Sequence, residues 1–121
     1  MVEGGCFCGE IRYSFNSGKY YTSDCHCSMC RRISGAAFVS WMAIPNNDFE
    51  YTKGKPKELI SSSFGKRYFC GDCGTPLVCL LDEDQKNTYI TICTLDQPNQ
   101  YVPKTSIFNE DMLSWIRSKN A

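Results

Sequence analysis

The segment CGDCG, residues 70–74, pairs two thiols across a tight turn, and the segment CFCG, residues 6–9, does the same about sixty residues upstream. Two cysteines this close together can bind one metal ion. The glycine that follows each pair, Gly9 or Gly74, can adopt a positive φ that lets the backbone wrap the ion. A metal shared by both pairs would tie the start of the chain to its middle. We therefore predict a closed metal site with four ligands: Cys6, Cys8, Cys70 and Cys73.

A third cysteine group, CHCSMC at residues 25–30, supplies three thiols within six residues. Structural zinc sites are closed by four protein ligands, whereas catalytic sites keep three and leave one position for water or substrate. Seven thiols therefore divide into four and three, and the open set is Cys25, Cys27 and Cys30. Other arrangements stay open: the triplet borrows a cysteine from a pair, His26 acts as a fourth ligand or as a neighbour of one, or the triplet holds a second structural zinc.

Composition and charge narrow the class of protein. The 121 residues suit one zinc-binding domain over residues 1–121, and the nine cysteines are many and odd in number, which disfavours a disulfide framework. No signal peptide or membrane span is evident, so we expect a cytoplasmic protein with reduced thiols. Thirteen basic and thirteen acidic residues cancel, which disfavours nucleic acid and membranes as partners and favours a small ligand. Several residues outside the three groups are expected to pack in the core: Cys79, Cys93, Trp41, Tyr68, Phe69 and Tyr89.

Short strands dominate the expected secondary structure. Apolar and β-branched patterns predict strands at residues 11–15, 38–44, 49–53, 59–63, 66–69, 77–81 and 88–94. Residues 82–84 are expected to begin a loop. Only the C-terminal end looks helical, with Asn109 as N-cap and an apolar stripe of Met112, Trp115 and Ile116. The chain is thus predicted to be mainly β, with one amphipathic C-terminal helix docked on it.

Four segments carry a resemblance to a known family: GGCFCGEIRY (4–13), CHCSMCRRISGA (25–36), SSFGKRYFCGDCGTPL (62–77) and TLDQP (94–98). Together they resemble the glutathione-dependent formaldehyde-activating enzyme family, which also contains centromere protein V. The resemblance implies a β-tent of small antiparallel sheets around two zinc ions. It implies a structural zinc at Cys6, Cys8, Cys70 and Cys73, and a catalytic zinc at Cys25, Cys27 and Cys30. The implied reaction joins glutathione to formaldehyde as S-(hydroxymethyl)glutathione, and its reverse is that of a carbon–sulfur lyase.

Two positions depart from the family pattern. Ser106 stands where relatives often carry a histidine before the Ile-Phe pair, and Cys93 stands where a glycine is expected. Neither residue belongs to the seven expected ligands. A pocket shaped by that histidine would take a different substrate in this chain.

The chemistry of the triplet favours sulfur over water. Three thiolates leave a bound Zn²⁺ with a net negative charge and low Lewis acidity, which suits the binding of a further thiolate. The leading hypothesis is a zinc enzyme that joins a small thiol to a small carbonyl compound. An anionic thiol such as glutathione would need cations for its carboxylates, and the candidates are Arg31, Arg32, Lys66 and Arg67. The alternatives are a non-catalytic zinc module for a protein or chromatin partner, and a redox or iron centre on the same thiols.

Overall fold

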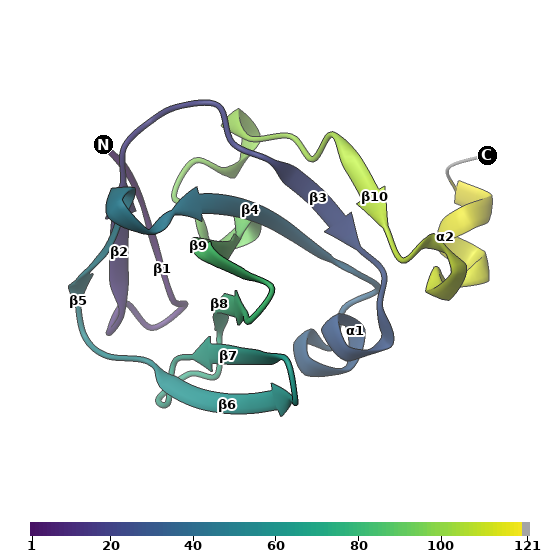
Figure 1. Ribbon diagram of the computed structural model, residues 1–121, viewed down its shortest axis with the longest axis horizontal. Coiled ribbons are helices and arrows are strands. Elements are labelled where there is room, and N and C mark those ends of the chain that lie inside the picture. Colours follow the sequence, from purple (N-terminus) through teal and green to yellow (C-terminus); the bar gives the residue numbers. More distant parts are fainter. Residues whose placement is uncertain (120–121) are drawn as a thin grey trace.

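The chain folds into two β-sheets, as the computed structural model shows for residues 1–119 (Figure 1). The smaller sheet has the order β1-β2-β5, with β1 at Val2–Gly5, β2 at Arg12–Phe15 and β5 at Phe49–Lys53. The larger sheet has the order β10-β3-β4-β9-β8-β7-β6. Its strands are β3 Thr22–Cys25, β4 Val39–Pro45, β6 Lys57–Ser62, β7 Gly65–Phe69, β8 Pro76–Leu81, β9 Asp84–Thr91 and β10 Thr105–Ile107. Neighbouring strands are antiparallel except for the parallel pair β10 and β3, so the mainly β prediction is confirmed.

The main core lies between the two sheets. Its largest fully buried side chains come from β2, β4, β8 and β9: Tyr13, Phe15, Met42, Ile44, Leu77 and Ile90. Burial of each such apolar side chain stabilises the fold by roughly 1.5–3 kcal/mol. The first strand was expected to be half-buried, yet Ser14 is buried as well, because β2 is the central strand of its sheet.

The larger sheet has two different faces, because successive side chains of a strand point to opposite sides. One row across β4, β9, β8 and β7 belongs to the main core or packs against it: Met42, Ile90, Val78 and Tyr68. The adjacent row points the other way: Ala43, Tyr89, Cys79 and Arg67. A second, smaller apolar cluster that includes Trp41 and Cys79 forms on that opposite face.

Two α-helices accompany the sheets. The expected C-terminal helix is present as α2, Ser114–Lys119, but it is short and has no buried residue, so it does not dock on the core as expected. Figure 1 shows it at the periphery, beyond β10. Asn109 does not cap this helix and instead begins a short 3-10 turn, η4, Asn109–Asp111. The sequence did not predict the other helix, α1, which spans Ser28–Ser34 and follows β3 directly.

Three further details of the predicted strands need correction or confirmation. The strand expected at residues 88–94 ends at Thr91, where the 3-10 turn η2, Ile92–Thr94, interrupts the alternation and leaves Cys93 exposed rather than packed. The other cysteine that was expected in the core, Cys79, is buried as predicted. Residues 82 and 83 form a tight turn between β8 and β9 instead of a loop, and Asp84 begins β9, where it pairs with Leu81. Among residues 1–119, no helix is both long enough and apolar enough to span a bilayer.

Candidate metal centres

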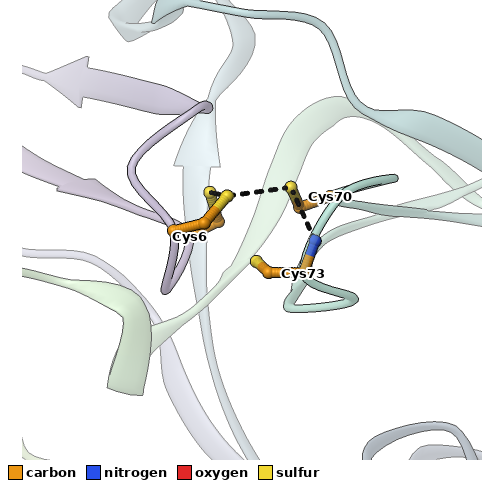
Figure 2. Close-up of side chains that lie close together, drawn as sticks. Cys6, Cys70 and Cys73 are labelled. Carbon is orange, nitrogen blue, oxygen red and sulfur yellow. Dashed lines mark hydrogen bonds between the residues drawn. The ribbon is translucent and has the colours of Figure 1, made fainter.

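The four cysteines of the two pairs meet at one place. Their sulfur atoms all lie within 4.8 Å of one another, although the pairs come from loops after β1 and after β7. Figure 2 shows Cys6 projecting from its loop toward Cys70 and Cys73. The sulfur of Cys8 lies 3.6 Å from that of Cys6 and 3.7 Å from that of Cys70. A zinc tetrahedron with bonds near 2.3 Å has edges of about 3.8 Å, so this sulfur set fits a zinc ion without a fifth ligand.

Local turns fix these sulfurs. Gly9 and Gly74 have φ angles of 81° and 83°, and their N–H groups donate to the carbonyls of Cys6 and Cys70, as the sequence predicted for turns that wrap an ion. Thr75 links the two turns, because its Oγ1 accepts from the N–H of Phe7 at 3.1 Å and lies 3.2 Å from the sulfur of Cys73. That contact with Thr75 lowers the pKa of the Cys73 thiol, which favours the thiolate that a metal needs.

The three remaining candidate ligands gather where β3 passes into α1. The sulfurs of Cys25, Cys27 and Cys30 lie within 4.8 Å of one another, and those of Cys25 and Cys30 are 3.5 Å apart. Cys27 caps α1, since its sulfur accepts from the N–H of Cys30 at 3.2 Å. Cys25 and Cys30 are buried and Cys27 is half-buried. Within residues 1–119 this group has no fourth cysteine, histidine or carboxylate, so a bound metal ion would keep one position open.

His26 lies between two of these ligands in sequence but points elsewhere. Its buried ring packs on Phe38, with ring centroids 4.9 Å apart, and its backbone N–H donates to the carbonyl of Ile107. The ring nitrogens do not belong to either cysteine group, and Nδ1 is buried without a partner among the described residues. The arrangement in which His26 completes the triplet is therefore not the one that the fold adopts.

Arg67 is the one of the four basic candidates that reaches the triplet. Its Nη2 donates to the sulfur of Cys30 at 3.4 Å, and its guanidinium carbon lies 5.7 Å from the ring centroid of Trp41. Its Nε is buried without a partner within residues 1–119. Contact with Cys25 and the nearby guanidinium hold the pKa of Cys30 below its ordinary value. The other three candidates, Arg31, Arg32 and Lys66, do not line the space beside the triplet. Arg32 and Lys66 are exposed, and Arg31 is half-buried.

A cavity of about 380 Å³ opens beside the three sulfurs. This volume lies in the range of small-molecule sites. All three cysteines line it, together with Trp41 and Arg67, and its other walls are largely apolar. A second cavity of about 310 Å³ lies against Cys30, Trp41 and Arg67 as well, and extends between α1 and the strands β6 and β7. None of the four cysteines of the other cluster lines either cavity, although Gly74, which follows Cys73 in sequence, lines the second one.

The sequence analysis did not identify some of the residues that line the cavity. Trp41 and Tyr89 were expected in the core, and both line the cavity beside the triplet. Four others were not singled out: Phe64, Glu83, Phe108 and Asp111. The first three come one or two residues after a strand ends, which is the one signal that sequence reasoning could have used. Phe108 has a φ of 55°, a left-handed conformation that is rare outside glycine and costs on the order of 1 kcal/mol.

Comparisons with known proteins agree with this geometry. The sequence profile of a family described as glutathione-dependent formaldehyde-activating enzyme matches residues 1–111. A relative from Schizosaccharomyces pombe, named as an uncharacterized lyase, is 27% identical in an alignment of 126 positions that covers 90% of this chain and 91% of that protein. One from Halomonas elongata, provisionally named as a glutathione-dependent formaldehyde-activating enzyme, is 29% identical over 85 residues, or 64% of this chain and 54% of the other.

A solved structure of a Rhodobacter sphaeroides protein has the same fold. It superposes with a TM-score of 0.70 over 86% of this chain and 98% of that one, at 18% sequence identity. The arrangement of the two sheets is therefore shared with an experimentally determined structure.

Proposed function

The chain belongs to the glutathione-dependent formaldehyde-activating enzyme family, and from this premise we propose that it is a zinc-dependent carbon–sulfur lyase. In the synthetic direction it joins a small thiol of the glutathione type to formaldehyde or a related small carbonyl compound. The sulfur–carbon bond forms as the carbonyl π bond breaks, and the thiol proton ends on the new hydroxyl group. The reaction therefore needs neither an oxidant nor a reductant.

The observation that supports this proposal most strongly is the placement of three sulfurs, and not four, at the wall of a cavity. A zinc ion held by Cys25, Cys27 and Cys30 would offer its fourth position to a substrate sulfur and favour the deprotonated form of that sulfur. The apolar walls, which include Trp41, limit the access of water that would compete for the same place. The four-cysteine cluster has no such space and suits a structural zinc.

We assign Arg67 the task of keeping Cys30 in its thiolate form. Its guanidinium lies 3.4 Å from that sulfur and carries a charge of the opposite sign. The contact also holds the guanidinium over Trp41, where the aromatic face stabilises the cation. All nine cysteines are free, which suits a reducing compartment, and we propose the cytoplasm as the place of action.

The test compares two single substitutions in the zinc-loaded protein. Formation of the S-hydroxymethyl hemithioacetal from thiol and formaldehyde is followed by exchange NMR. Cys27→Ser should lower the catalysed rate by at least about 100-fold, because it removes a proposed zinc ligand. Cys93→Ser, which changes an exposed thiol outside both clusters, should match the wild type. A Cys27→Ser protein with wild-type activity at saturating substrate would refute the enzyme and leave the non-catalytic zinc module.

A further inference from the structure

The cavity beside the triplet has an unusual balance of charge for a site that would hold an anionic peptide. Among residues 1–119, three ionisable residues other than cysteine and tyrosine line it: Arg67, Glu83 and Asp111. Glu83 lies in the turn between β8 and β9, and Asp111 ends the turn η4. Two carboxylates and one guanidinium therefore face the space that a substrate would occupy.

Both carboxylates are uncompensated. Neither Glu83 nor Asp111 makes a side-chain hydrogen bond or an ion pair within residues 1–119, where the one ion pair joins Arg12 to Asp96. Both residues are exposed, so their carboxyl groups are in contact with water at the rim of the cavity. Their negative potential acts on any ligand that enters the cavity.

The turn that carries Asp111 is held by local bonds. The hydroxyl of Ser106 donates to the side chain of Asn109, and the backbone N–H of Asp111 donates to the carbonyl of Phe108. The guanidinium of Arg117 also donates to the carbonyl of Asn109, at 2.6 Å. Because three bonds order this short segment, the backbone of Asp111 is held in place beside the cavity that the residue lines.

The single guanidinium is already engaged. It contacts the sulfur of Cys30 and lies over Trp41. Three thiolates around a bound dication would leave one negative charge, which Arg67 would offset. No cation of the lining is then left for the carboxylates of a substrate, and Glu83 and Asp111 would repel them.

We propose that this cavity selects thiols whose non-reacting part is neutral or positively charged, and that it disfavours thiols with free carboxylates. The inference rests on the proposed function and narrows its substrate class. The aromatic side chains of Phe64 and Phe108 at the same cavity suit an apolar or cationic group equally well. Two carboxylates and two aromatic rings thus act together as the specificity determinant.

The test uses one peptide in two charge states. Glutathione carries a net charge of about −1 at neutral pH, and its diethyl ester, with the same backbone and thiol, carries about +1. The dissociation constant of each is measured by calorimetry without formaldehyde, and kcat/KM is measured with it. The ester should bind at least about fivefold more tightly and react with a correspondingly higher kcat/KM, as expected for unit charges several ångströms apart in a hydrated cavity. The difference should shrink in high salt.

Matched double variants assign the effect to the two carboxylates. Glu83→Gln with Asp111→Asn should remove most of the preference by improving the binding of glutathione. The control, Asp82→Asn with Glu110→Gln, changes the net charge equally at adjacent exposed positions that do not line the cavity. This double variant should retain most of the preference for the ester.

Three outcomes separate this inference from the proposed function. Preference for glutathione over its ester, or a preference that the first double variant leaves unchanged, would overturn the charge selection while turnover remains. Absence of catalysed turnover for both thiols, with the predicted binding order intact, would refute the lyase and keep the selection. Equal binding of both thiols by the wild type would overturn the selection irrespective of turnover.

Discussion

The two cysteine clusters are built from the same residue type and differ in everything around the sulfurs. The four-cysteine cluster joins two loops about sixty residues apart, and two of its members, Cys6 and Cys70, belong to the main core between the sheets. The three-cysteine cluster comes from one short segment and belongs to the second apolar cluster, on the opposite face of the larger sheet. One connects distant parts of the chain, and the other lines a cavity.

This contrast shows how one metal can serve two purposes in a small protein. A ligand set that spans the chain stabilises the fold, because binding free energy becomes folding free energy. A local ligand set adds little to the fold, so it can leave a coordination position for a substrate. The predictions below test that division of labour, beginning with the largest expected effect.

The strongest contrast is expected between Cys70→Ser and Cys27→Ser. Cys70→Ser should lower the free energy of unfolding by more than about 4 kcal/mol, because it removes one of the four proposed metal ligands that join the two loops. Cys27→Ser should cost no more than about 2 kcal/mol, because it weakens a local site and a helix cap. Urea unfolding of the zinc-loaded proteins, followed by circular dichroism, measures both. Similar losses of unfolding free energy in the two variants would contradict the division into a stabilising cluster and a catalytic cluster.

An intermediate effect is expected at Arg67. Arg67→Met keeps the apolar contact with Trp41 but removes the charge beside Cys30, and should lower kcat/KM by about 10- to 100-fold with little change in stability. Lys66→Met is the matched control, because its exposed side chain is adjacent in sequence but does not line the cavity. Steady-state kinetics and thermal melting measure the two quantities. Wild-type kinetics in Arg67→Met would contradict the proposed role of this residue beside Cys30.

The smallest effect is expected at the ion pair that joins β2 to the segment after η2. Arg12 donates two hydrogen bonds to Asp96, one of them 2.9 Å long, and holds the pKa of that carboxyl below its ordinary value. A lowered pKa stabilises the fold above pH 4 or so, and the gain is lost as the pH falls through the folded-state pKa. Because the pair is largely hydrated, Asp96→Asn should cost less than about 1 kcal/mol at pH 7.

Urea unfolding at pH 7 and at pH 3 tests the sign of this effect. The difference between wild type and Asp96→Asn should be present at pH 7 and should diminish at pH 3. Glu50→Gln, at an exposed position of β5, should show no such dependence. A cost of Asp96→Asn that grows toward pH 3 would contradict the assignment.

Much of the fold could be predicted where local patterns and tertiary structure agree. The strand at residues 49–53 matches β5, and the buried strand at residues 77–81 differs from β8 by one residue. The spacing of the cysteines also anticipated which sulfurs would gather, since a tight turn brings the members of each pair together. Positive φ at both glycines followed from the same argument.

Other elements depend on contacts that no local pattern contains. The strand β1 includes Gly4 and Gly5, which are poor strand formers, and it is held by pairing with β2. The helix α1 is only seven residues long, and its N-cap is Cys27, which is not a typical capping residue. Gly35, which ends it, was the available sign. The strand β10 is three residues long and pairs in parallel with β3, far away in sequence.

The site was predictable in its sulfurs and not in its walls. Arg67 and Lys66 are neighbours of the same charge in sequence, and strand alternation alone decides which of them reaches Cys30. Glu83 and Asp111 come from turns whose positions relative to the cavity depend on the whole sheet. The charge that a substrate meets is therefore a property of the folded chain.

The most direct test of the incomplete triplet is the release of zinc to a chromogenic chelator, measured on freshly purified wild type and Cys27→Ser. We expect two zinc ions per wild-type chain, one released rapidly from the three-cysteine site and one slowly from the four-cysteine site, with the rapid phase absent in Cys27→Ser. A single zinc ion per chain, or two ions released together at the slow rate, would contradict the account.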